Sequence, residues 1–424
     1  MEIDNFLLNK EDYRYKSKIT NSTIFFGVLL AFFLGFLVSV YIWPENDSVL
    51  SQRFWLTTFA IPIGASTAIA ASLIGYRKME VTAANQDDED NRAAAMAAAG
   101  RPLALLGASY RYTTSPSGDD IDTIESGSLS IPILKNFADG SEPMRGRWFD
   151  TSFAFPRQPK EWAVEEFDRH TNLSRWLLEI LLKELAPQIA KIPPGVRCVA
   201  HLHFSSRLYK SANMKCWEEV ASYVLLRLFP VVYQETDAKG VLSFDKWLDD
   251  AISQTGEEAR LIIAIQLQSV RAPPWVRDGS TEAASALLVM SDALAEKHGL
   301  KKQADLHRPV TSTVEKHVDA VRLAMRIART TGKRIAKVWQ IGIPLKQIVS
   351  LSVMNREAEV VAPVIDIDRT VGAAGVAAPW FAVACAHALL QKHGGTQMVT
   401  AGSGDKVSTL ILKPTQKNTR GVSR

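Results

Sequence analysis

The chain has 424 residues, 47% of them hydrophobic and 22% charged, so it is long enough for one large domain or two ordinary ones and is neither disordered nor collagen-like. Its 49 basic and 45 acidic residues give a formal charge of only +4, which argues against a nucleic-acid-binding protein. Three cysteines, Cys198, Cys216 and Cys385, form no CxxC pair. We therefore expect no disulfide framework and a reducing compartment for the soluble part.

Two uncharged apolar stretches near the N-terminus predict a transmembrane hairpin over residues 23–76. Residues 23–43 and 54–76 each match the roughly 20 residues that a helix needs to cross about 30 Å of hydrocarbon. Pro62, Gly64 and other small residues dilute the second stretch, so we expect it to pack closely against the first helix or a partner. A cleaved signal peptide is the alternative, but the first stretch is too long and a second span follows it.

The charges that flank the two stretches predict their orientation. In the N-terminal segment 1–22, Lys10, Arg14, Lys16 and Lys18 precede the first stretch, and the second stretch is followed by Arg77 and Lys78. The short connection 44–53 holds two acidic residues and a single cation. The positive-inside rule therefore places both termini and the soluble domain on the cytoplasmic side.

An α/β domain is expected over residues 102–414. Residues 77–101, acidic and Ala-rich, predict a solvated linker with partial helical character, and 415–424 a disordered basic tail. Apolar runs predict strands at 102–113, 197–205, 260–268, 282–290, 336–343 and 407–413. Helical patterns cover 172–190, 214–228, 244–253, 313–330 and 370–393. This alternation indicates a covered sheet that is parallel in part or mixed.

Motifs for familiar chemistry are missing from the sequence. It contains no GxxxxGK[ST], GxGxxG or GxSxG, and residues 401–405 read as a hairpin turn. His201 and His203 project from one face of a predicted strand, with Cys198 on the other face, but no third ligand accompanies them. We therefore expect no metal and no other cofactor.

Eight tryptophans fall in the soluble part, and we expect most of them to fill the core rather than line a groove for a partner. Those in Pro- and Arg-rich loops are the ones expected to be exposed: Trp148, Trp162 and Trp275.

The stretch DIDRTVGAAGVAAPWFAVACAHALL, residues 366–390, resembles the C-terminal signature of the thiolase-like β-ketoacyl synthases. RDGSTEAASALLV, residues 277–289, resembles another strand of that family. The resemblance implies a thiolase-like fold, in which Arg369 stands where the family has a catalytic histidine. A guanidinium stays protonated and cannot replace a neutral imidazole. Cys216 precedes a predicted helix, but NMKCWEEV lacks the family's Gly-rich elbow. The catalytic set is therefore expected to be lost.

A second resemblance rests on DLHRPV, residues 305–310, together with the N-terminal anchor and the α/β domain. These features are similar to the type VI lipase adapter family. The resemblance implies a non-enzymatic adaptor at the bacterial inner membrane, which binds a lipase toxin effector and helps load it onto a type VI secretion spike. No binding residues are transferred from that family.

The leading hypothesis is therefore a membrane-anchored adaptor with a degenerate thiolase-like domain. The alternative is a membrane-bound acyl-transfer or acyl-binding enzyme, with Cys216 as nucleophile and His201 or His203 as base. A structural scaffold without a client is the third possibility. The small residues in the spans leave a homo-oligomer open.

Overall fold

The computed structural model describes residues 19–44, 48, 51–114, 119–134, 144–149, 162–225, 229–234, 244, 247–248, 258–270 and 277–415. The chain divides into a helical unit, residues 9–96, and an α/β body from residue 97 onward. Most of the expected N-terminal segment, most of the 244–253 helix and nearly all of the basic tail lie outside the described residues.

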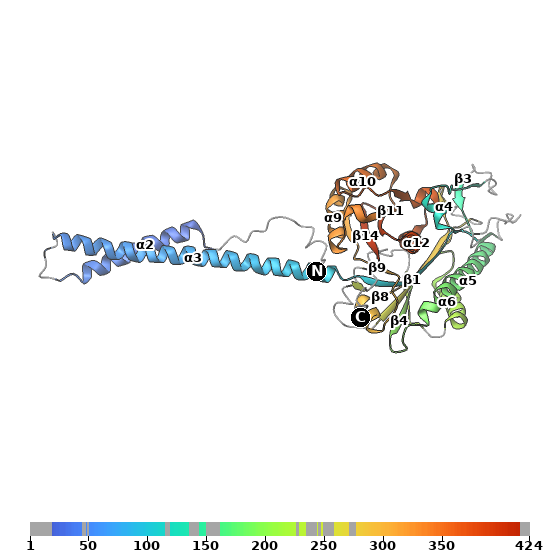
Figure 1. The fold of residues 1–424 in the computed structure, drawn as a ribbon, viewed down its shortest axis with the longest axis horizontal. Coiled ribbons are helices and arrows are strands. Elements are labelled where there is room, and N and C mark those ends of the chain that lie inside the picture. The colour runs from blue at the N-terminus through green and yellow to red at the C-terminus, as the bar shows by residue number, and fades with distance from the viewer. Residues whose placement is uncertain are drawn as a thin grey trace, which may run out of the picture. The chain divides into compact units, whose positions relative to one another are not determined.

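The helical unit is a hairpin of α2 (Asn21–Tyr41) and α3 (Gln52–Ala99), drawn in blue in Figure 1. Both helices are long and apolar enough to cross a membrane. They approach closely at small residues, because a Cβ added to Gly35 would lie 3.0 Å from the Cα of Pro62. Arg77 Nη1 also donates a hydrogen bond to Asn21 Oδ1 at 2.7 Å. This is the tight pairing that the small residues of the second stretch predict.

The segment predicted as a linker is helical through Ala99, as a continuation of α3. Its alanines have the highest helix propensity of any residue. An ion pair between Asp88 and Arg92, four residues apart at 3.1 Å, adds modest support on the exposed surface.

Eleven strands of the body form one mixed sheet. In chain order they are β1 (Leu103–Arg111), β4 (Arg197–Ser205), β5 (Val231–Gln234), β6 (Glu258–Gln266), β8 (Ala283–Ser291), β9 (Ala304–Leu306), β10 (Val310–Thr313), β11 (Ile335–Ile341), β12 (Val364–Asp366), β13 (Thr396–Ser403) and β14 (Lys406–Pro414). The spatial order is β12-β11-β13-β14-β9-β1-β8-β6-β4-β5, with β10 paired to β14. A small second sheet joins β2 (Ile133–Leu134), β3 (Met144–Arg147) and β7 (Ser280–Thr281).

The large sheet consists of two halves with the same topology. In the first half β4 lies parallel to β5 and β6, while β8 runs antiparallel to both β6 and β1. In the second half β11 lies parallel to β12 and β13, while β14 runs antiparallel to both β13 and β10. The body is therefore a duplicated α/β unit.

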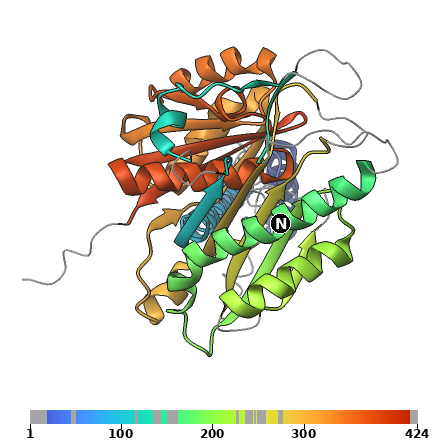
Figure 2. The same ribbon diagram turned by 90° about the vertical axis from the view of Figure 1, so that its right-hand side faces the viewer.

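Helices cover both faces of this sheet. In Figure 2, α5 (Trp162–Ile189) and α6 (Lys210–Val224) lie side by side in green along one face of the first half, where they form a core with β1, β4, β6 and β8. The other face packs against α12 (Ala378–His393), whose small side chains allow a helix to be buried on all sides. The second half carries α9 (His317–Ile327) and α10 (Leu345–Glu357). The described part of the body also contains three short helices: α4 (Ile121–Glu125), α8 (Asp292–Lys297) and α11 (Ile367–Thr370).

All six predicted strands are present, and the turn at residues 401–405 joins β13 to β14. The helix expected over 370–393 is wrong in its first part, because the chain leaves α11 and starts α12 only at Ala378. Gly372 and Gly375 between them have φ values of +116° and +50°, which a right-handed helix does not allow. The sequence pattern also missed helix α10 and five strands of the large sheet: β5, β9, β10, β12 and β13.

Candidate functional site

Cys216 lies inside α6 rather than before a helix, which corrects the sequence-based prediction. Its side chain is only 2% exposed and packs in the core beneath α5 and α6, where Sγ lies 4.0 Å from the carbonyl oxygen of Thr171. Burial raises the pKa of the thiol above its usual value. Cys216 is therefore a poor nucleophile at neutral pH.

His201 and His203 occupy the opposite face of the sheet from Cys216. The His201 ring lies 4.7 Å from Trp247, and the His203 ring 5.2 Å from Trp380, measured between ring centroids. Burial lowers the pKa of His201 to about 3, with help from Arg260, and that of His203 to about 4. Strand β4 separates both imidazoles from the Cys216 thiol. The predicted pairing of this nucleophile with either base is wrong.

Arg369 and the two remaining cysteines also fail to form a catalytic group. Arg369 is exposed on α11, where its backbone N–H donates to the Asp366 carboxylate that caps the helix. Cys385 is fully buried in α12, and burial raises its thiol pKa well above the usual value. Cys198 is 2% exposed and lies on the α5/α6 face of β4. The sequence predicts this placement, on the other face of the strand from His201 and His203. All three cysteines of the chain are thus buried.

The string that carries the adapter resemblance lies in the interior of the body. Residues 304–306 form β9 between β1 and β14, and residue 310 begins β10. His307 is 6% exposed and Arg308 only 1%. Lys302 Nζ forms an ion pair with Asp305 Oδ1 at 2.9 Å. This segment therefore supports the fold and offers no surface to a partner.

The tryptophans of the soluble part mostly fill the core. Trp217, Trp247, Trp339 and Trp380 are buried, as expected. Trp148 is buried as well, which corrects the prediction that it is exposed; its ring packs over Gly146, where a Cβ would lie 2.3 Å away. Trp275 and the side chain of Trp162 lie outside the described residues.

Among the described residues, one group could in principle hold a metal ion: Asp122, Glu125 and His393. Lys392 pairs with Asp122, and Lys337 Nζ lies 2.8 Å from Glu125 Oε1. Both carboxylates therefore already have cationic partners. This arrangement is a surface ion-pair network, not a developed metal centre.

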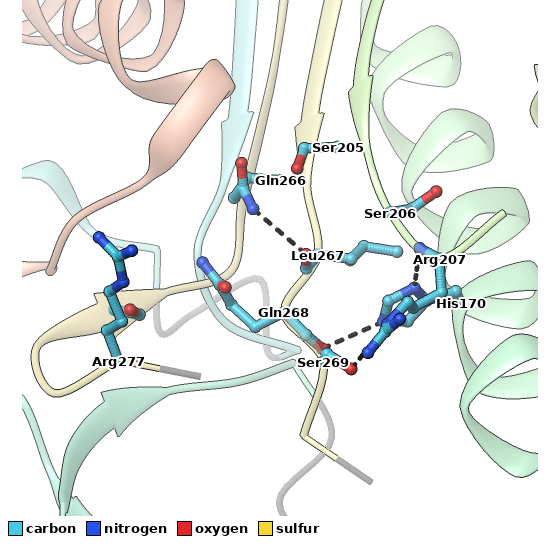
Figure 3. Close-up of a pocket in the computed structure, with 10 residues that line it drawn as sticks. His170, Ser205, Ser206, Arg207, Gln266, Leu267, Gln268, Ser269 and Arg277 are labelled. Carbon is cyan, nitrogen blue, oxygen red and sulfur yellow. Dashed lines mark hydrogen bonds between the residues drawn. The ribbon is translucent and has the colours of Figure 1, made fainter. Parts of the chain in front are cut away.

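The described body contains a cavity of about 370 Å³ at the carboxyl ends of β4 and β6 (Figure 3). These parallel strands end side by side, with Ser205 paired to Gln266, and this edge of an α/β sheet is where ligands commonly bind. The sequence motifs searched did not reveal it. The described lining residues are His170, Ser205, Ser206, Arg207, Gln266, Leu267, Gln268, Ser269, Arg277 and Ser280.

His170 lines this cavity and has polar partners at both ring nitrogens. The backbone N–H of Arg207 donates to His170 Nδ1 at 2.8 Å, so Nδ1 carries no proton. The other nitrogen, Nε2, lies 2.9 Å from Glu166 Oε1 and 3.1 Å from the carbonyl oxygen of Gln268. The imidazole thereby links α5 to the segments that follow β4 and β6, as the dashed lines in Figure 3 show in part.

A buried ionic network of Arg169, Glu166 and Glu282 contacts His170 through Glu166. Arg169 donates to Glu166 at 3.1 Å and to Glu282 at 2.6 Å, and all three side chains are at most 2% exposed. Glu282 also accepts the backbone N–H groups of Phe149 and Gln268, each at 2.9 Å. Because every charge has a partner, the network fixes the backbone that forms one wall of the cavity.

Gln266, another lining residue, reaches the segment before α12. Gln266 Oε1 accepts the backbone N–H of Val376 at 3.0 Å. A Cβ on Gly375 would lie 2.1 Å from that oxygen, so only glycine allows the approach. The GAAG segment noted in the sequence thus joins the second half of the sheet to the edge that carries the cavity.

No protein-family model matches the chain, and no curated protein matches it. Solved ketosynthases do match its fold. One from module 6 of the bacillaene synthase of Bacillus subtilis 168 has 12% identity and a TM-score of 0.56, covering 74% of this chain and 72% of that chain. One from module 1 of the bacillaene synthase of Bacillus amyloliquefaciens FZB42 has 12% identity and a TM-score of 0.53, with coverages of 77% and 75%.

A β-ketoacyl synthase from Burkholderia phymatum STM815 also matches, with 11% identity and a TM-score of 0.51, over 74% of this chain and 100% of that chain. The body therefore has the thiolase-like ketosynthase fold, as the first resemblance implies. At these identities the likeness concerns the fold alone. The type VI adapter resemblance stays a prediction.

Proposed function

We propose that this protein is a membrane-anchored binding protein, an adaptor that uses the ketosynthase fold without condensing chemistry. The observation that carries the proposal is the burial of every thiol: Cys198 and Cys216 are 2% exposed and Cys385 is not exposed at all. Acyl transfer through a thioester needs a thiolate that a substrate can reach. With no such group, the body is left to act by binding.

The histidines and the arginine that were candidates for catalysis support the same proposal. His201 and His203 are packed against tryptophan rings and stay neutral. Arg369 is exposed on α11, and a guanidinium does not take the role of a neutral imidazole base.

The partner proposed is a lipase toxin effector, which the adaptor helps to load onto a type VI secretion spike. This choice rests on the adapter resemblance, and the charges flanking the hairpin favour a cytoplasmic body at the inner membrane. Two anchoring helices would hold a captured client close to a membrane-embedded secretion apparatus and raise its local concentration there.

An apolar strip on α10 is the surface we propose for the client. Leu345, Val349 and Val353 recur every four residues along the helix and are 82%, 72% and 58% exposed. The other face of the helix already packs inward through Leu351, with Ile348 and Met354 partly buried. Contiguous exposed apolar side chains mark interaction surfaces more often than isolated ones do.

Purification of the tagged full-length protein from its native cells in mild detergent, followed by mass spectrometry, tests the proposal. We expect a lipase-like toxin or a spike protein in near-stoichiometric amount. Replacing all three strip residues, Leu345, Val349 and Val353, by serine should abolish this capture. The control is Val164→Ser on α5, since Val164 is 62% exposed but lies outside the strip.

The acyl-transfer alternative predicts different results. Acyl carrier protein or coenzyme A in place of a toxin would contradict the adaptor. So would rapid alkylation of any cysteine in the native protein by iodoacetamide near neutral pH, because only a reachable, activated thiol reacts this way.

A further inference from the structure

Most of the described residues that line the cavity at the carboxyl ends of β4 and β6 have polar side chains. Leu267 is the single apolar side chain among its described lining residues. Sites for apolar ligands are lined mainly by hydrophobic and aromatic side chains. At about 370 Å³ the cavity has the size of a small-molecule site, and its lining calls for a ligand rich in oxygen atoms.

The charge of the lining favours an anion. Arg207 and Arg277 are both exposed and lie on different sides of the cavity in Figure 3, and no carboxylate is among the described lining residues. Glu166 and Glu282 lie nearby, but both are paired with the buried Arg169. The two arginines therefore bring positive charge to the lining of the cavity.

The remaining lining groups are neutral. They include four serines, and Ser269 accepts a hydrogen bond from Arg207 Nε at 2.9 Å. That contact orients the guanidinium. Guanidinium groups together with hydroxyls match the three terminal oxygens of a phosphate ester, since arginine binds this group in a bidentate way.

The wall that carries these donors is rigid. His170 accepts from the backbone of Arg207, and Glu282 accepts from the backbone of Gln268, so both strand ends are tied to the buried network. Donors fixed in place before binding lose little entropy when a ligand arrives. We propose that this cavity binds a phosphate ester, carried either by a soluble metabolite or by a lipid headgroup. The proposal is independent of the adaptor function.

Titration calorimetry on the detergent-solubilised full chain tests it, with glycerol 3-phosphate and inorganic phosphate as probes. We expect saturable binding that weakens about tenfold in Arg277→Gln, the usual effect of losing one charge-assisted contact. Arg197→Gln is the matched control, because Arg197 is exposed at the opposite end of β4. Its affinity should equal that of the unchanged protein.

A second arm distinguishes the two sources of the phosphate. The chain is incorporated into phosphatidylcholine vesicles with or without phosphatidic acid, and quenching of its tryptophan fluorescence by a headgroup-labelled phosphatidic acid is measured. Quenching that is lost in Arg277→Gln would support a lipid headgroup as the ligand. Binding of glycerol 3-phosphate without quenching by the labelled lipid would support a soluble metabolite. Absence of both signals, or equal affinities in Arg277→Gln and Arg197→Gln, would overturn the proposal.

Discussion

At the residue scale, buried histidines make the stability of the body depend on pH. Burial lowers the pKa of His201 to about 3 and that of His203 to about 4, below the value of about 6.5 in an unfolded chain. Between these values the unfolded state binds more protons than the folded state. Stability is therefore complete above about pH 6.5 and is lost as the pH falls toward 4. His307 and His387 act in the same direction.

Four aspartates oppose this trend over part of the range. Burial raises the pKa of Asp119 and of Asp368 to about 6, and it also raises the pKa of Asp305 and of Asp366. These carboxyls therefore take up protons first in the folded state. The pKa shifts of His201 and His203 are larger than those of Asp119 and Asp368, so we expect a net loss of stability in acid.

The prediction is checked by urea unfolding of the body at pH 7 and pH 5. The double variant His201→Leu, His203→Leu should show a smaller drop in midpoint between the two pH values than the unchanged protein. His393→Leu serves as the control, because His393 is 53% exposed and should leave the drop unchanged. An equal drop in all three proteins would contradict the explanation.

At the scale of elements, the buried network of α5 is predicted to be the main stabiliser of the sheet edge that carries the cavity. Glu282→Gln removes the charge that Arg169 faces at 2.6 Å, with both side chains buried. Breaking a buried ion pair in this way typically costs about 3–5 kcal/mol. We expect a clearly lower urea midpoint, and a further decrease when Arg169→Met is added, because the buried Glu166 then loses its cationic partner as well.

Glu296→Gln on α8 provides the comparison, because Glu296 is exposed and its replacement should change stability by less than about 0.5 kcal/mol. Equal midpoints for Glu282→Gln and Glu296→Gln would show that the network contributes little.

The sequence predicted the strands of the sheet far better than the candidate site. Runs such as residues 260–268 are apolar on both faces, so they reveal a buried strand without help from other segments. The start of α12 could not be predicted from the sequence alone. The alanines before it favour a helix, but Gly375 is required there by its contact with Gln266, more than 100 residues away in the chain. Helix α10 was missed because its outer face is apolar and hides the amphipathic period.

The cavity was missed for a related reason. Its donors come from residues that follow two different strands, Ser206 and Arg207 after β4 and Gln268 and Ser269 after β6. Neither set forms a motif by itself. The available signal was the change from apolar to polar residues at the ends of two strands, which becomes a site only if the strands are parallel neighbours.

At the scale of the whole molecule, the helical unit and the body are predicted to be separable. The two large core clusters of the body contain no residue before Leu103. The helical unit contributes instead two helices with many exposed apolar side chains, including Phe25, Leu30 and Leu34. We therefore expect the body to fold without the hairpin, and the hairpin alone to determine membrane attachment.

A variant that begins at residue 97 should be soluble without detergent and should unfold at the same urea concentration as the full chain. The full chain should stay with membranes after an alkaline carbonate wash, because two spanning helices bury far more apolar surface than a peripheral contact. Leu30→Arg in the middle of α2 should weaken insertion, since a central arginine costs about 2.5–3.5 kcal/mol. Release of the full chain by carbonate, or aggregation of the shortened variant, would show that the apolar helices cover the body instead of a bilayer.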